Sequence, residues 1–154
     1  MSAFKTCLIG ESGVGKSTLS KMLRQQSVTD PRKPTIGVNI EKIPTKEGNM
    51  CLWDLAGQRR FRLMWDEFMR GSELTIVVTD SSTKNVMLTK DLIERHLNNS
   101  AAKIIAIANK QDLENRMNPG EIEAALGIPT FGMVGIQSEN SEKLQQIIER
   151  NIRK

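Results

Sequence analysis

The chain has 154 residues, of which 38% are hydrophobic and 26% charged, and its formal net charge at pH 7 is +4. These values are typical of one folded domain over residues 1–154, and no apolar run approaches the roughly 20 residues that cross a bilayer. The modest positive charge permits contact with nucleic acid or anionic membranes, but it favours a mildly basic, solvated surface.

The first predicted element is a strand over Ala3–Ile9, with no charged and then apolar leader before it. We therefore expect a cytoplasmic protein. Cys7 lies in this strand and Cys51 in a later apolar run, so we expect two small buried hydrophobes rather than a disulfide or a metal pair.

A glycine-rich run, Gly10–Ser17, follows this strand and has the spacing of a phosphate-binding loop. Its glycines let successive backbone N–H groups point at a di- or triphosphate, and the following helix adds partial positive charge. We expect Lys16 to reach the terminal phosphates and Ser17 to ligate Mg²⁺. The expected nucleotide contacts are Ser12, Gly13, Val14, Gly15, Lys16, Ser17 and Thr18. The loop alone leaves kinases, ATPases and GTPases open.

A helix is predicted next from the spacing of Leu19, Met22 and Leu23. It is followed by the proline-stiffened loop Lys33–Gly37, which carries Thr35. The Thr35 hydroxyl could ligate Mg²⁺ and its backbone could contact a γ-phosphate, so this loop would be ordered only in the triphosphate state.

Two strands, Gly37–Ile43 and Met50–Asp54, are predicted around a hairpin turn at Thr45–Asn49, as the one antiparallel pair of the sheet. Asp54, at the end of the second strand, is expected to hold Mg²⁺ through a water. The N–H of Gly57 can approach a γ-phosphate closely, and Gln58 beside it could orient an attacking water.

The segment Arg59–Phe68 mixes three cations with large apolar groups. A helix that packs its apolar side on the core explains part of this pattern, and the basic trio could meet an anionic membrane or an acidic partner. His96 is expected to be an exposed helix residue rather than a catalyst.

Strands over Leu74–Thr79 and Lys103–Ala108 come next, and the second leads into Asn109-Lys110-Gln111-Asp112. The Asp112 carboxylate can accept hydrogen bonds from the N1–H and the exocyclic amine of guanine, which adenine cannot supply. Asn109 is expected to tie this loop to the phosphate loop, and the Lys110 stem to cover the face of the base.

The last predicted elements are a helix at Gly120–Leu126, a strand at Phe131–Ile136 and a C-terminal helix. Asn118-Pro119 and Gly127 mark the ends of the first of these helices. The C-terminal helix is predicted from an apolar stripe at Leu144, Ile147, Ile148 and Ile152. Six strands separated by helices predict an α/β fold, a mostly parallel sheet covered on both faces.

Taken in order, these motifs resemble the Ras superfamily of small GTPases over essentially the whole chain. The Arf/Sar branch is the most similar. The segments of this chain that resemble the Arf/Sar branch are Pro34–Glu41, Trp53–Gln58, Ala108–Leu113 and Met117–Gly127.

This resemblance implies a Ras-like G domain of the P-loop NTPase class that binds GTP or GDP with Mg²⁺. It implies two switches, at about residues 28–38 and 55–71, which respond to the γ-phosphate. The connection from Thr35 to Asp54 resembles the Arf interswitch, which in that family can slide in register between nucleotide states. Val38, Trp53 and Phe68 match the exposed hydrophobic cluster that effectors read.

The assigned catalytic roles are charge neutralisation by Lys16, γ-phosphate sensing by Thr35 and water positioning by Gln58. No arginine in the loop after the first helix is an obvious internal finger, although Arg32 is close, so we expect slow intrinsic turnover that a GTPase-activating partner accelerates. We also expect an exchange factor, effectors in trafficking or signalling, no nucleic acid and a monomer.

The chain departs from the Arf pattern at three places. Ser2 stands where myristoylation needs glycine, and the last residues, Asn151–Lys154, hold no prenylated cysteine, so we expect no lipid anchor and membrane contact only through partners. Glu11-Ser12 and Ala56 are more similar to Rab or Ras proteins. The loop that reads the base oxygen is reduced to Gln137–Asn140, where Ser138 and the backbone of Glu139 are the candidates.

Two other functions stay open. One is a nucleotide-binding interaction module with negligible turnover, and the other, a weaker candidate, is a P-loop ATPase. Loss of Lys16, Thr35 or Gln58 would favour the module, but all three are present.

Overall fold

The computed structural model describes residues 3–23, 38–57, 59–98, 100–134 and 140–152. Within these ranges six strands form one sheet in the order β2-β3-β1-β4-β5-β6. The strands are β1 (Ala3–Gly10), β2 (Val38–Thr45), β3 (Gly48–Leu55), β4 (Leu74–Thr79), β5 (Lys103–Ala108) and β6 (Thr130–Gly132). The helices are α1 (Lys16–Leu23), the 3-10 helix η1 (Arg59–Met64), α2 (Trp65–Met69), α3 (Thr83–His96), α4 (Pro119–Leu126) and α5 (Asn140–Ile152).

The strands β2 and β3 are antiparallel, and the other neighbouring pairs are parallel, as the sequence predicts. The hairpin ladder continues to the pair Thr45 and Gly48, so both strands extend beyond their expected ends. At this closed end the Thr45 hydroxyl accepts a hydrogen bond from the N–H of Glu47 at 3.1 Å and donates one to the Gly48 carbonyl at 2.8 Å.

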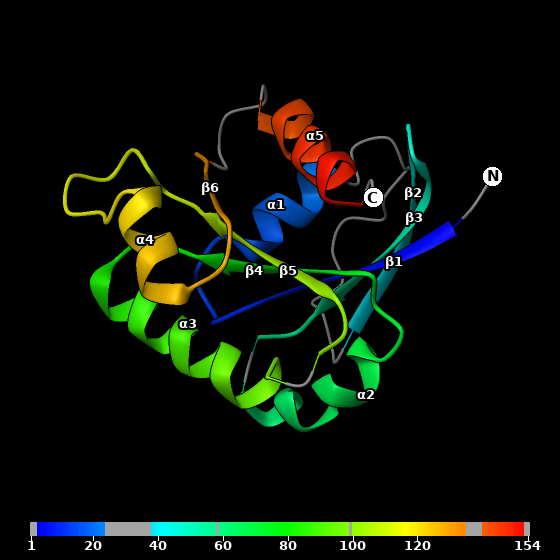
Figure 1. Ribbon diagram of the computed structural model, residues 1–154, viewed down its shortest axis with the longest axis horizontal. Coiled ribbons are helices and arrows are strands. Elements are labelled where there is room, and N and C mark those ends of the chain that lie inside the picture. Colours follow the sequence, from blue (N-terminus) through cyan, green and yellow to red (C-terminus); the bar gives the residue numbers. More distant parts are fainter. Residues whose placement is uncertain (1–2, 24–37, 58, 99, 135–139, 153–154) are drawn as a thin grey trace.

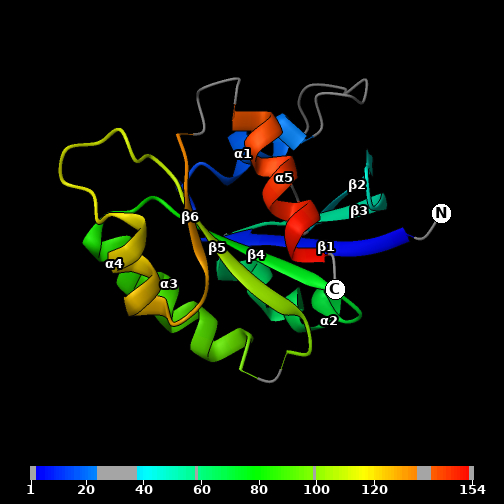
Figure 2. The same cartoon turned by 45° about the horizontal axis from the view of Figure 1, so that its top comes forward.

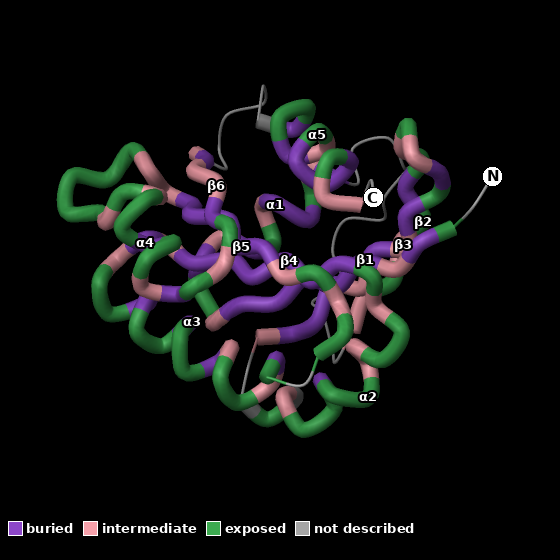
Figure 3. The backbone as a smooth tube through the Cα atoms, viewed as in Figure 1, coloured by how far each residue is buried: buried purple, intermediate pink, exposed green. Residues whose placement is uncertain are grey.

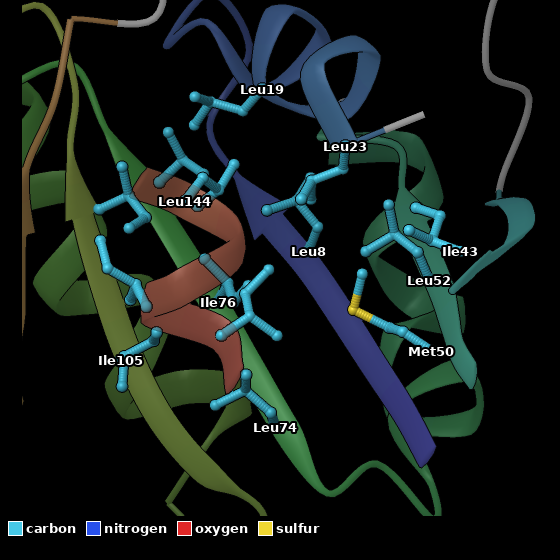
Figure 4. Packing of buried hydrophobic residues seen from close by; sticks show 14 of the residues in the cluster. Leu8, Leu19, Leu23, Ile43, Met50, Leu52, Leu74, Ile76, Ile105 and Leu144 are labelled. Carbon is cyan, nitrogen blue, oxygen red and sulfur yellow. The ribbon is translucent and has the colours of Figure 1, made fainter. Parts of the chain in front are cut away.

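Helices cover both faces of the sheet (Figures 1 and 2). On one face, α1 and α5 bury Leu19, Leu23 and Leu144 against the strands (Figure 4). On the other face, α2 and α3 pack over Cys7, Ile9 and Val77 with side chains such as Trp65 and Leu92, and α4 packs beside α3. Every residue of β4 is buried, and the central strands are the most buried part of the chain in Figure 3, which fits a two-sided parallel sheet.

The predicted strand at Phe131–Ile136 is shorter than expected, because β6 ends at Gly132. Its partner β5 ends at Ala108, whose carbonyl accepts the last ladder bond from the N–H of Met133 at 2.9 Å. Beyond Ala108 the chain leaves the strand for a turn, from which the N–H of Gln111 still donates to the Met133 carbonyl at 3.2 Å. Residues 135 and 136 of the prediction lie outside the described residues.

The ends of α4 follow the residues that predict them. The Asn118 side chain accepts a hydrogen bond from the N–H of Glu121, whose own side chain accepts from the N–H of Asn118, so the two form a capping box. Pro119 is the first helical residue, and Gly127 ends the helix in the left-handed conformation, with φ +74°.

Both cysteines are free, as expected. Cys7 is fully buried, and this burial raises the pKa of its thiol. Cys51 is only half-buried. No helix among the described residues combines the length and the apolar character needed to span a membrane.

Candidate nucleotide-binding site

The phosphate loop, Gly10–Ser17, joins the end of β1 to the start of α1. Gly13 and Gly15 have φ angles of +83° and +92°, which side chains rarely adopt. A β-carbon at Gly15 would also collide with the Asn109 side-chain amide. The glycine spacing is therefore required by the fold of the loop, and such turns expose the backbone N–H groups that bind anions.

Lys16 and Asp54 form an ion pair beside this loop. Lys16 is the first residue of α1, and the pairing of Leu8 with Asp54 sets the carboxylate near the carboxyl end of β1. The two side chains are only 10% and 6% exposed. The residues expected to bind phosphate and the metal shell are thus adjacent, in surroundings where an unpaired charge is costly.

The Ala56–Gly57 turn is pressed against the phosphate loop. A β-carbon at Gly57 would collide with the carbonyl oxygen of Gly10, so only glycine allows this approach. Trp65, which is fully buried, donates its indole N–H to the Ala56 carbonyl at 3.1 Å. The backbone of Gly57 therefore lies beside the loop, as the expected role requires.

Two charged residues that the sequence analysis did not pair meet at the same turn. The Arg62 guanidinium donates to the carbonyl of Gly57 through Nε at 3.1 Å and through Nη2 at 2.9 Å. Nη2 also lies 2.8 Å from the Glu11 carboxylate. Arg62 was expected to be one of three cations available to a membrane or a partner, but its charge is used inside the protein. In the sequence, Glu11 was the hint that a cation lies nearby, because a carboxylate in a phosphate-binding loop is stabilised by an adjacent positive charge.

The guanine loop, Asn109–Asp112, is bonded to the phosphate loop at two points. The buried Asn109 side chain donates to the Val14 carbonyl at 3.0 Å, which confirms the expected tie. The Lys110 ammonium donates to the Gly13 carbonyl at 3.0 Å, from a left-handed backbone with φ +59°. The Asp112 side chain is exposed. A strained lysine held in this way keeps its stem beside the loop.

A cavity of about 600 Å³ lies between these elements. Its lining comes from the phosphate loop, the start of α1, the Ala56–Gly57 turn and Lys110. Of the residues expected to bind nucleotide, those on this lining are Ser12, Gly13, Gly15, Lys16, Ser17, Thr18, Gly57 and Lys110. The Val14 side chain belongs to the core instead, so only its backbone faces this part of the molecule.

Several expected site residues lie outside the described residues. These are Thr35, Gln58, Ser138, Glu139 and Arg32, together with most of the first switch. Their assigned roles stay predictions.

The expected effector cluster lies where α2 packs beside β2 and β3. The rings of Trp53 and Phe68 are 6.1 Å apart, and Val38 packs against the same core cluster. The ammonium of Lys5 lies 3.8 Å from the centre of the Trp53 ring. All three members are half-buried rather than fully exposed, because α2 packs over this part of the sheet.

The prediction of an exposed His96 is wrong. Its side chain is 21% exposed and lies 3.8 Å from the Asp66 carboxylate. Its ring meets the buried Trp65 ring edge-on, with the centres 5.0 Å apart. The last turn of α3 therefore covers Trp65, a contact between distant segments that helical spacing does not indicate.

The family model and the similar proteins found by comparison indicate the same family. The family model described as "ADP-ribosylation factor family" matches residues 2–150. ADP-ribosylation factor-like protein 5 of Caenorhabditis elegans is 33% identical over 134 residues, which is 83% of this chain and 74% of that protein. ADP-ribosylation factors J and K of Dictyostelium discoideum are 36% and 35% identical over 128 residues each, which is 79% of this chain and 66% of each relative. The chain thus spans about two thirds to three quarters of the length of these relatives. On the match across residues 2–150 and on these identities, the chain belongs to the ADP-ribosylation factor family and is an Arf-like small GTPase of the Ras superfamily.

Proposed function

We propose that the protein is a Mg²⁺-dependent switch that binds GTP, hydrolyses it slowly and changes its two switch segments with the nucleotide. The observation that carries this proposal is the pair of hydrogen bonds from Asn109 and Lys110 to the phosphate loop. They fix the loop expected to read guanine next to the loop expected to hold phosphates, so one ligand can contact both.

The phosphate end of the cavity suits a nucleoside polyphosphate with Mg²⁺. Lys16 would hold the terminal phosphates, while Ser17, Thr35 and, through a water, Asp54 would hold the metal. The fit is supported by the oxygen donors at this end of the cavity and by Gly13 and Gly15, whose positive φ angles shape a loop that exposes backbone N–H groups. When bound, Mg²⁺ supplies positive charge that neutralises the phosphates.

The γ-phosphate would be detected by the backbone of Gly57 and by Thr35. The closeness of Gly57 to Gly10 supports this role, since a phosphate on the loop would lie within reach of both. Gln58 would position the attacking water. We infer slow intrinsic turnover, because the sequence of the loop after α1 shows no arginine at an obvious finger position. An exchange factor, an activating protein and effectors would act at the switches, the effectors at Val38, Trp53 and Phe68.

The test is single-turnover GTP hydrolysis by Gln58→Leu, with Gln146→Leu as a matched control on the exposed side of α5. We expect Gln58→Leu to lower the hydrolysis rate by about tenfold or more while GTP binding persists, because only water positioning is lost. The control should hydrolyse at the wild-type rate. Undiminished hydrolysis by Gln58→Leu, with and without an activating protein, would refute the role of Gln58. GTP binding without hydrolysis by the wild type would instead support a nucleotide-binding module.

A further inference from the structure

Glu11 occupies an unusual place for a carboxylate. It is the second residue of the phosphate loop, where a negative charge repels the phosphates that the loop is proposed to hold. The structure pairs it with Arg62 at 2.8 Å, and both side chains are only 16% exposed. An ion pair this sheltered is little screened by salt, and removing one partner leaves a mostly buried charge.

Arg62 is held on three sides. Besides Glu11, it binds the Gly57 carbonyl through two nitrogens, and its guanidinium carbon lies 5.3 Å from the centre of the Trp65 ring. Trp65 in turn holds the Ala56 carbonyl. Two consecutive carbonyls of the turn are therefore fixed by side chains from the following helices, and one of these side chains is anchored on the phosphate loop.

We propose that Arg62, anchored by Glu11, is a positioning residue for GTP hydrolysis. It fixes the Gly57 peptide against the phosphate loop, so that this backbone is oriented before the reaction begins. The inference rests on the proposed function, because it assigns a role within that reaction. The Gly57 carbonyl belongs to the peptide unit that leads to Gln58, so releasing this carbonyl would let that peptide unit reorient.

This arrangement predicts an effect on rate more than on nucleotide binding. The phosphate loop, Lys16 and the guanine loop contact the cavity without help from Arg62. Loss of the arginine should therefore leave GDP affinity nearly intact and slow the chemical step. If the ion pair were only structural, its loss would lower the stability of the protein and would not reduce the hydrolysis rate more than the GDP affinity.

The chain offers a matched control pair. Asp91 and Arg95 of α3 are also an acid–arginine pair, 2.8 Å apart, but their side chains are 59% and 72% exposed and they lie outside both switches. Exposed pairs of this kind contribute little. Asp91→Asn and Arg95→Gln therefore change the net charge as Glu11→Gln and Arg62→Gln do, without touching the Gly57 turn.

The experiment measures the melting temperature, the GDP dissociation constant and the single-turnover GTP hydrolysis rate of these four variants, of Arg62→Lys and of the double variant Glu11→Gln/Arg62→Gln. We expect Arg62→Gln to slow hydrolysis by about tenfold or more, with GDP affinity within about threefold of wild type. Arg62→Lys should retain more of the rate, because it keeps the cation and one donor. The double variant should be no slower than Arg62→Gln, and the control pair should match wild type.

A wild-type hydrolysis rate in folded Arg62→Gln overturns the inference while the proposed function stands. So does a loss of rate matched by an equal loss of GDP affinity, since that indicates a structural role. If Arg62→Gln does not fold, Glu11→Gln decides: the inference predicts slower hydrolysis, and a wild-type hydrolysis rate overturns it. Absence of GTP hydrolysis by the wild type overturns the proposed function and the inference together.

Discussion

Asp112 follows the buried strand β5 and the two residues that tie the guanine loop to the phosphate loop, and its own side chain is exposed. In the proposed function its carboxylate would accept two hydrogen bonds from guanine, through N1–H and the amine at C2. Xanthine carries an oxygen at C2 instead, which needs a donor. On this proposal, the side chain at this position determines which purine fits.

Asp112→Asn should shift the base preference of the site from guanine to xanthine. Its amide would donate to the C2 oxygen of xanthine but face the guanine amine with a donor, so we expect GTP affinity to fall by about a hundredfold or more and XTP affinity to rise. Competition of GTP and XTP against a fluorescent GDP analogue measures both. Asp91→Asn, on the exposed side of α3, is the control. Unchanged GTP affinity in Asp112→Asn would contradict the base-reading role.

Single residues also show where prediction from sequence stops. The bond from Asn109 to the phosphate loop could be predicted, because the ends of parallel strands meet at one edge of the sheet. The pairing of Glu11 with Arg62, 51 residues later, could not, because it depends on how η1 lies on the loop. The placement of His96 against Trp65 depends on helix packing in the same way.

At the scale of elements, α5 holds the tip of the β2–β3 hairpin. The carboxylate of Glu149, a residue only 7% exposed, accepts a hydrogen bond from the backbone N–H of Lys46 at 2.8 Å. A slide of the hairpin, as the Arf resemblance implies, would have to break this bond. The slide itself stays a prediction.

Glu149→Ala should destabilise the protein by about 1–2 kcal/mol, because the buried acceptor for the Lys46 N–H is lost. Glu149→Gln keeps an acceptor oxygen and should cost less. Urea unfolding followed by circular dichroism measures both, with Gln146→Ala on the exposed side of α5 as the control. Equal stabilities of Glu149→Ala and the control would show that the bond contributes nothing.

Element boundaries were predictable where the residues themselves end a helix, as Asn118 and Gly127 do for α4. Element boundaries were not predictable where a neighbouring strand sets the end of an element. The strand β6 ends where β5 ends, at the pair Ala108 and Gly132, and the apolar run after Gly132 contains no sign of this limit.

At the scale of the whole molecule, the fold explains why motifs far apart in the sequence form one site. The strands β1, β3 and β5 are parallel and lead into the phosphate loop, the Ala56–Gly57 turn and the guanine loop, so all three gather at one edge of the sheet. The alternation of strands and helices predicts this topology, and the order of the motifs predicts the site. The contacts that hold the Ala56–Gly57 turn against the phosphate loop depend on how the helices pack, and the hydrophobic periodicity of the sequence does not predict them.

The central claim is that this site selects guanine nucleotides, and the affinity of the nucleotide-free protein for GTP and ATP with Mg²⁺ tests it most directly. An unpaired Asp112 carboxylate against adenine predicts that GTP binds about a thousandfold tighter or more than ATP. The nucleotide that copurifies with the protein should accordingly be GDP or GTP. Equal affinities for GTP and ATP, or copurified adenine nucleotide, would contradict the account.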